Sequence, residues 1–132
     1  MKALLLAVAY LLSSATAGLT LNQVDIILKL QRDVRAGKTL IIKPNTRTPC
    51  YPVLEPNNPG YVERYIESTD EWERIGLLSF TSSWGNNKRL GIYTSNLMCP
   101  GGTRGLASYG YVEIEDIIAI GIGSNLINIE NY

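Results

Sequence analysis

The sequence predicts a small α+β domain in which two helices pack on an antiparallel β-sheet. We expect it to be built from two tandem pseudo-repeats, each a helix, a strand, a cysteine and a second strand. Three pairs of matching features support this prediction: a Gly-Tyr-Val-Glu tetrapeptide at 60–63 and 110–113, a basic-to-apolar segment at 38–42 and 88–92, and Cys50 with Cys99. The units would span about 19–67 and 69–120, followed by a C-terminal strand at 121–132.

The first seventeen residues are typical of a secretory signal peptide. Lys2 supplies a positive charge, residues 3–12 are apolar, and Ala15 to Ala17 resemble a cleavage signal of small residues. The alternative is a buried N-terminal helix. We expect residues 1–17 to be removed and residues 18–132 to form a single secreted domain. The apolar run is too short to span a bilayer, and no later segment is long enough, so we expect no transmembrane segment.

In the first unit, apolar residues at helical spacing predict a helix over 21–35, ended at Gly37. A short strand is expected at 38–43. Residues 44–59 are rich in proline and are predicted to form an irregular loop. The alternation of apolar and polar residues at 61–66 indicates a second strand.

In the second unit we expect a helix that begins at Ser68 or Thr69, runs through Leu78 and is extended by 80–84. Its first turn would be rich in acidic residues, which complement the amides of a helix N-terminus. The matching strand is expected at 88–94. The apolar run 117–122 predicts a strand at the centre of the sheet, buried on both faces, and 126–130 an edge strand.

The only two cysteines, Cys50 and Cys99, are expected to form a disulfide, because cysteines of exported chains usually pair. Equivalent positions in two repeats can meet across a pseudo-two-fold axis. The alternative is that each cysteine pairs with another chain. A free catalytic thiol is disfavoured, since the chain holds no histidine to activate it.

The absence of histidine limits the chemistry that the chain can perform. Ser-His-Asp and Cys-His hydrolysis and the common histidine-bearing zinc sites are excluded. No motif for a cofactor is present, so we predict neither a cofactor nor a metal. Twelve basic and twelve acidic residues leave a neutral chain, without the basic surface that nucleic acids require.

Two sets of residues are candidates for a site. Glu63 and Glu113 occupy equivalent places in the tetrapeptides and could act as a carboxylate pair in glycoside hydrolysis. They could equally share a calcium ion, or be solvent-facing residues beside Arg64 or Arg89. The second set is predicted to bind a ligand through wide, rigid aromatic contacts, although each ring could instead pack in the core. It comprises Trp84, Tyr93, Arg104 and Tyr109.

Three function classes follow from these observations. The favoured one is a secreted, non-enzymatic binding protein, such as an effector, a toxin subunit or a lectin-like module, with a protein or glycan partner in a host or in the environment. A sheet edge could also pair with a second copy into a homo-oligomer. The alternatives are a glycan hydrolase that uses Glu63 and Glu113, and a protease inhibitor that presents the loop 44–59.

Overall fold

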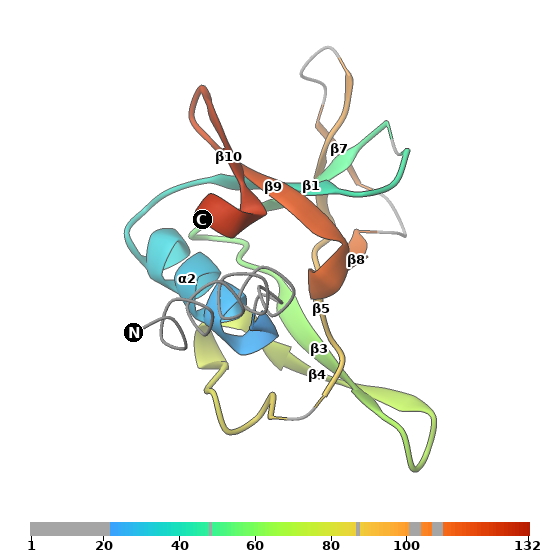
Figure 1. Ribbon diagram of the computed structural model, residues 1–132. Helices are drawn as coiled ribbons and strands as arrows, with labels where there is room; N and C mark the ends of the chain where they lie inside the picture. The colour runs from blue at the N-terminus through green and yellow to red at the C-terminus, as the bar shows by residue number, and fades with distance from the viewer. Residues whose placement is uncertain (1–21, 48, 87, 101–103, 107–109) are drawn as a thin grey trace, which may run out of the picture.

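The computed structural model describes residues 22–132 apart from 48, 87, 101–103 and 107–109, and for 104–106 the course of the backbone (Figure 1). The predicted signal peptide, 1–17, lies outside the described residues. Within them the chain forms one α-helix, α2 (Gln23–Arg35), and strands arranged in two antiparallel sheets.

The helix α2 forms where the apolar spacing predicts it. The side chain of Asn22 caps its first turn by accepting a hydrogen bond from the amide of Val24. Its inner face buries Ile27 and Leu30 completely. Gln31, also buried, donates from Nε2 to the carbonyl oxygens of Leu77 and Phe80. The helix is therefore held by its buried apolar side chains and by hydrogen bonds to segment 77–80.

The larger sheet has six strands in the order β10-β9-β1-β2-β6-β7. Two of the sequence predictions can be located here. The apolar segment β9 is an interior strand between β1 and β10, but a register shift at its start leaves Ile118 39% exposed. The last strand, β10, is an edge strand as predicted. The bounds are β1 Leu40–Pro44, β2 Tyr51–Leu54, β6 Asn96–Met98, β7 Arg104–Leu106, β9 Ile117–Ile122 and β10 Asn125–Asn128.

The smaller sheet has four strands in the order β4-β3-β5-β8. Its inner face carries Val62, Ile92 and Val112, which lie side by side across three strands and are buried. They share one hydrophobic core with α2 and with the inner face of the larger sheet. The hairpin of β3 and β4 extends away from this core (Figure 1). The bounds are β3 Tyr61–Ile66, β4 Glu71–Gly76, β5 Leu90–Tyr93 and β8 Tyr111–Glu113.

The two sheets meet at Thr94, where the chain passes from β5 to β6. Its buried hydroxyl donates to the carbonyl of Val53 and accepts from the amide of Asn96. Its own amide donates to the carbonyl of Gly110. A Cβ added to Gly110 would lie 1.5 Å from the carbonyl oxygen of Thr94, so only glycine fits this crossing.

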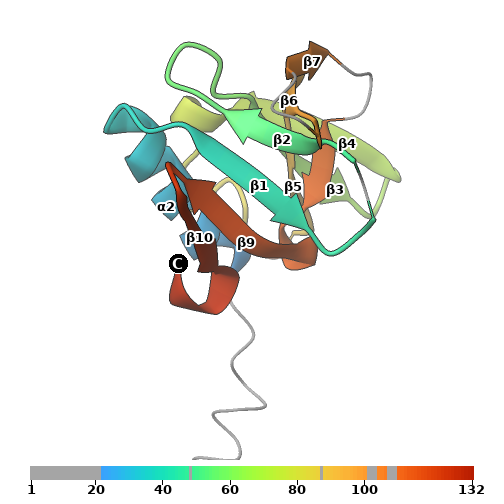
Figure 2. The same ribbon diagram turned by 90° about the horizontal axis from the view of Figure 1, so that it is seen from above.

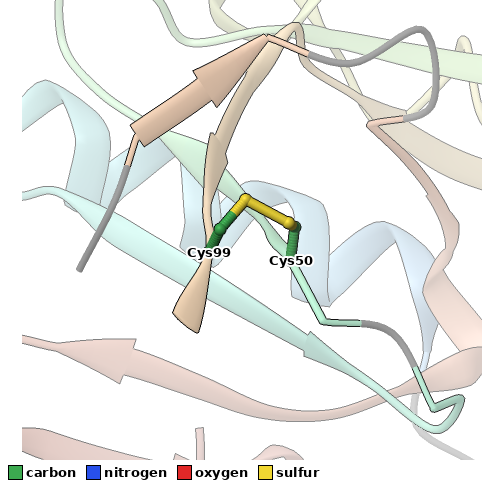
Figure 3. Close-up of a disulfide and its surroundings, with 2 residues drawn as sticks. All are labelled: Cys50 and Cys99. Atoms are coloured by element: carbon green, nitrogen blue, oxygen red, sulfur yellow. A yellow bond between two sulfur atoms is a disulfide. The ribbon is translucent and has the colours of Figure 1, made fainter. Parts of the chain in front are cut away.

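Cys50 and Cys99 form the predicted disulfide within one chain (Figure 3). Cys50 directly precedes β2 and Cys99 directly follows β6, and these two strands are paired through Tyr51 and Met98. The bond therefore joins neighbouring strands of the larger sheet at one end of their ladder.

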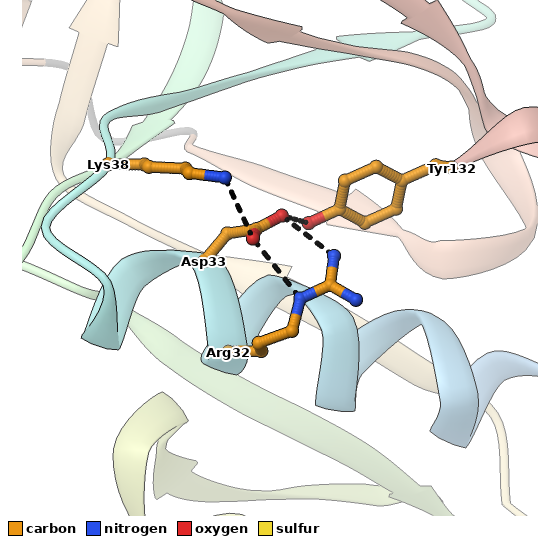
Figure 4. Close-up of polar contacts among 4 residues, drawn as sticks. All are labelled: Arg32, Asp33, Lys38 and Tyr132. Carbon is orange, nitrogen blue, oxygen red and sulfur yellow. Dashed lines mark hydrogen bonds and ion pairs between the residues drawn. The ribbon is translucent and has the colours of Figure 1, made fainter.

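A polar cluster around the buried carboxylate of Asp33 fixes Tyr132 to the helix (Figure 4). The Tyr132 hydroxyl donates to a carboxylate oxygen of Asp33 at 2.6 Å, and Arg32 and Lys38 contact the same carboxylate. Burial of Asp33 opposes its ionisation, but the hydrogen bonds from Arg32 and Tyr132 and the two positive charges outweigh it and lower the pKa of Asp33. Asp33 thus acts as a buried charged anchor for the C-terminal turn.

The predicted fold class is wrong in its central feature, because the described chain is mostly β and holds one α-helix rather than two. The segment predicted as the second helix, from Ser68 or Thr69 through Leu78 with its extension over 80–84, instead forms β4, a 3₁₀ turn and a second turn. Cross-strand pairs with β3 override the helix-favouring residues. Asp70 at φ +54° makes the turn that allows this hairpin.

The two predicted units are consequently not copies of one structure. Units 19–67 and 69–120 begin with a helix and a strand respectively, and their strands are divided between two sheets, as the views from the side and from above show (Figures 1 and 2). The segment 44–59 also departs from the expected loop. Its residues Tyr51–Leu54 form the interior strand β2, with Pro52, Val53 and Leu54 buried.

Candidate functional site

The outer face of the smaller sheet gathers aromatic side chains, arginines and glutamates. Strand alternation places these residues on the face opposite the core residues Val62, Ile92 and Val112. We call this surface the aromatic face. It consists of Tyr61, Glu63, Tyr65, Trp72, Arg74, Arg89, Gly91, Tyr93, Tyr111 and Glu113.

The repeated tetrapeptide organises this face. Its two copies flank β5 in the same register, so that Tyr61 and Tyr111 lie on either side of Tyr93. Glu63 and Glu113 lie in the same way on either side of Gly91. The sequence repeat therefore corresponds to a real structural equivalence, but only over one short strand segment.

Gly91 leaves room for an aromatic ring at the centre of the face. A Cβ at this position would lie 2.3–2.5 Å from three ring and hydroxyl atoms of Tyr111, so the Tyr111 ring covers the glycine. Trp72, on the edge strand β4, meets Tyr111 edge-on on the same face, with 5.5 Å between ring centroids. Burial raises the pKa of Tyr111 far above its ordinary value, and the charges of Glu113 and Glu63 raise it further. The phenol is therefore a neutral hydrogen-bond donor.

Two arginines cover four of the rings. Arg74 lies over Tyr61 and Tyr93, with its guanidinium carbon 5.0 and 4.3 Å from the ring centroids. Arg89 lies over Tyr65 and Trp72 at 4.8 and 5.2 Å. Such cation–π contacts are favourable even at exposed sites, at about 0.5–1 kcal/mol each. They hold the long arginine side chains flat against the sheet.

Each arginine also forms an ion pair with a glutamate of the repeated tetrapeptide. Arg74 binds Glu63 at 2.7 Å, and Arg89 binds Glu113 at 2.8 and 3.0 Å through two nitrogens. The candidate carboxylates are therefore not paired with each other. They lie two strands apart with Gly91 between them, and the Tyr111 ring covers that glycine.

The predicted ligand-binding residues fall in different places. Tyr93 lies on the aromatic face. Trp84 lies elsewhere, packed against the core with its ring edge-on to Phe80 and beneath the Arg64 guanidinium. Tyr109 lies outside the described residues. Arg104 belongs to β7, and its side chain also lies outside what the structure describes.

Sequence reasoning missed most of the face. Tyr61, Tyr65, Trp72 and Arg74 are not among the site residues that the sequence predicts. Residues 71–76 show no regular alternation of apolar and polar side chains, so only the pairing of β4 with β3 places Trp72 and Arg74 on the same side as Tyr61 and Tyr65.

The face is broad rather than hollow. Tyr61, Trp72 and Tyr111 are 44%, 38% and 36% exposed, a high value for large aromatic side chains grouped on one surface. The neighbouring hollows lie beside it: one of about 260 Å³ is bordered by Cys50, Tyr111 and Glu113, and one of about 300 Å³ by Tyr65, Lys88 and Arg89. This shape suits contact with a large partner better than enclosure of a small molecule.

Among the described residues there is no group of three or more His, Cys, Asp or Glu side chains placed to hold a metal ion. No helix in the described part of the chain is long and apolar enough to cross a membrane. Searches against protein-family models, curated proteins and solved structures find no match to this chain.

Proposed function

We propose that this chain is a secreted, non-enzymatic binding protein whose partner is another protein, held on the aromatic face. The observation that carries this proposal is the grouping of exposed Tyr, Trp and Arg side chains on one surface. These three residue types dominate the binding energy of protein interfaces. Tyr and Trp offer large contact areas that lose little entropy on binding, and Arg adds charged hydrogen bonds.

The arrangement of charges favours binding over hydrolysis. A glycosidase needs two carboxyl groups facing a common bond, about 5–10 Å apart and free to exchange protons. Here Glu63 and Glu113 are each held by an arginine, and the Tyr111 ring covers the residue between them. The glutamates instead orient Arg74 and Arg89, which reduces the entropy that those side chains would lose on binding.

The same contacts favour a protein over a glycan. Sugars stack on the open faces of aromatic rings, but four of the rings carry a guanidinium over one face. Such a surface resembles the centre of a protein interface, where aromatic and arginine side chains are enriched.

Export is supported by two independent features. The N-terminal segment has the charge, the apolar run and the small residues of a signal peptide. The disulfide between Cys50 and Cys99 fits an oxidising compartment. A mass measurement on chain recovered from the medium of an expressing cell tests export directly, with a mature chain that begins at Gly18 as the expected result.

The binding proposal can be tested with a photo-crosslinking amino acid placed at Tyr61 on the aromatic face. The matched control places it at Leu126 on β10, which is 59% exposed but belongs to the other sheet. We expect a protein adduct from position 61 alone, and loss of that partner's affinity in Trp72→Ala. Equal labelling from both positions, or specific binding on a glycan array with no protein adduct, would contradict the proposal.

A further inference from the structure

The edge strand β4 borders the aromatic face and has no neighbour beyond it among the described residues. Its burial pattern shows four consecutive exposed residues, Glu71 to Arg74, so the described chain leaves this edge open. The inference about this edge rests on the proposed function, because it concerns the segment of the partner protein that the edge would bind.

The hydrogen-bond pattern shows which backbone groups of β4 point outward. The amide of Leu77 donates to the carbonyl of Gly60, and hydrogen-bonded pairs alternate along an antiparallel ladder. Residues 71, 73 and 75 therefore bond to β3. The amides and carbonyls of Trp72, Arg74 and Gly76 point away from the sheet. On β3, the bond from the Tyr65 amide to the Arg89 carbonyl fits the same alternation.

Side chains divide along the same alternation. Trp72 and Arg74 lie on the aromatic face, whereas Glu71 and Glu73 lie on the opposite side. Glu73 forms an ion pair with Arg64 at 2.7 Å. An added antiparallel strand would hydrogen-bond to Trp72, Arg74 and Gly76, and its next residues would lie opposite Glu71 and Glu73.

A second copy of β4 fits this edge poorly. If two copies of β4 pair antiparallel about a two-fold axis at Trp72, Glu71 of one copy lies opposite Glu73 of the other. An axis at Glu73 places the two Glu73 residues opposite each other, and an axis at Arg74 does the same for the two Arg74 residues. Like charges directly opposite each other on neighbouring strands are destabilising. The charges therefore discourage self-pairing, which is how natural edge strands avoid aggregation.

We propose that the open edge of β4 binds an extended segment of the partner protein as an added antiparallel strand, with basic side chains opposite Glu71 and Glu73 and apolar side chains beside Trp72. The main-chain bonds supply affinity, and the alternation supplies specificity. The partner motif is basic–apolar–basic, repeated with the period of a strand. Its apolar residues extend the aromatic face by one row.

The direct test uses the capped heptapeptide Lys-Val-Lys-Val-Lys-Val-Lys as probe, with binding measured by calorimetry. In the proposed register the valines hydrogen-bond to β4, and the amides of the lysines point to solvent. N-methylation of the three valines should weaken binding at least about tenfold. N-methylation of the last three lysines, which adds the same number of methyl groups, should change it little. The peptide with glutamate in place of lysine should bind more weakly than the probe.

Two variants of the protein test the same contact from the other side. Gly76 has φ −58°, and a Cβ there has only the Ser79 hydroxyl within about 4 Å, so proline fits the backbone and removes one outward amide. Gly76→Pro should weaken the probe several-fold, and Gly76→Ala, which keeps the amide, should not. Glu71→Lys should also weaken it, whereas Glu130→Lys, the same charge change at an exposed distant site, should not.

The outcomes separate this inference from the proposed function. Equal affinity of the two N-methylated peptides, no binding of the probe at about 1 mM, or a dimer in ultracentrifugation that Gly76→Pro abolishes would each overturn strand addition. If Trp72→Ala still abolishes capture of a crosslinked partner in those cases, protein binding on the aromatic face is supported and only strand addition at β4 is rejected. If the probe follows the predicted pattern but position 61 captures no protein, strand addition at β4 is supported and the proposed function is rejected.

Discussion

Two clusters of arginine, carboxylate and tyrosine lie in this molecule, and they differ in burial. Around Asp33 the carboxylate is 5% exposed and receives a tyrosine hydroxyl, an arginine and a lysine, although the arginine and lysine side chains are themselves 61% and 49% exposed. On the aromatic face, Glu63 and Glu113 are 15% and 21% exposed, their arginines are about half exposed, and Tyr61 beside them is 44% exposed. Similar residues thus form an anchor for the C-terminal turn in one place and an open surface in the other.

The difference indicates where the chain uses polar side chains for folding. A buried charge must keep its partners, since losing one leaves the other without compensation. An exposed ion pair contributes little, because water replaces either partner. The aromatic face therefore holds side chains that stability alone does not require. Substitutions around Asp33 should accordingly lower the free energy of unfolding more than substitutions on the aromatic face.

Asp33→Asn should reduce the free energy of unfolding by about 2–3 kcal/mol, since the negative charge that the donors bind is lost and the amide NH2 that replaces one carboxylate oxygen faces two of those donors. Urea unfolding followed by tryptophan fluorescence measures the loss. Tyr132→Phe, which removes only the hydroxyl that bonds Asp33, should cost about half as much. A change below about 0.5 kcal/mol in Asp33→Asn would show that the cluster is not an anchor.

The pH dependence of stability should report the same anchor. Because the pKa of Asp33 is lower in the folded chain than in the unfolded chain, the unfolded state takes up its proton first as pH falls. Its contribution is complete above about pH 4 and is lost as pH falls through the lowered folded pKa. Wild-type stability should decline more steeply below about pH 4 than that of Asp33→Asn. Parallel curves would contradict this prediction.

Gly91→Ala should displace the Tyr111 ring, since the new Cβ would lie within 2.5 Å of three of its atoms. The ring end can move, so we expect a loss of only about 1–2 kcal/mol. Its release into solvent should lower the pKa of Tyr111 toward the ordinary tyrosine value, which an alkaline absorbance titration would detect. Gly76→Ala, a strand glycine with space around it, is the matched control. An unchanged titration would show that Tyr111 does not depend on Gly91.

Glu63→Gln and Glu113→Gln should each change stability by less than about 1 kcal/mol, with a smaller effect in high salt. Comparison of the two unfolding curves at low and high ionic strength gives this value. If either variant instead abolished hydrolysis of a glycan by the wild-type chain, the carboxylate-pair alternative would replace the binding proposal.

Local features of the sequence predicted the parts of the fold that local features determine. The apolar spacing gave the helix close to its true bounds, Gln23–Arg35, and the paired cysteines are confirmed. Segment 71–76 could not be assigned by composition, because its Glu and Arg residues favour a helix whereas Trp72 and Ile75 favour a strand. Its partner strand β3 decided it, through the pairing of Glu63 with Arg74 and Tyr65 with Trp72.

Only part of the site could be predicted, because its contacts also depend on which strands pair. Glu63, Glu113 and Tyr93 lie on the aromatic face, but the sequence alone did not show that arginines hold both glutamates. The repeated tetrapeptide did carry information: it marks two strands in the same register on either side of β5. The repetition predicts duplication of a whole unit, whereas in the structure the equivalence is limited to two strand segments of one sheet.

The contrast between the two clusters is tested most directly by one matched pair of substitutions, Tyr132→Ala and Tyr61→Ala, compared by urea unfolding. Tyr132 packs against the core and bonds buried Asp33, whereas Tyr61 is 44% exposed. We predict a loss of about 2–3 kcal/mol for Tyr132→Ala and less than about 1 kcal/mol for Tyr61→Ala. An equal or larger loss for Tyr61→Ala would show that the aromatic face is part of the structural framework, and would remove the basis for assigning it to a partner.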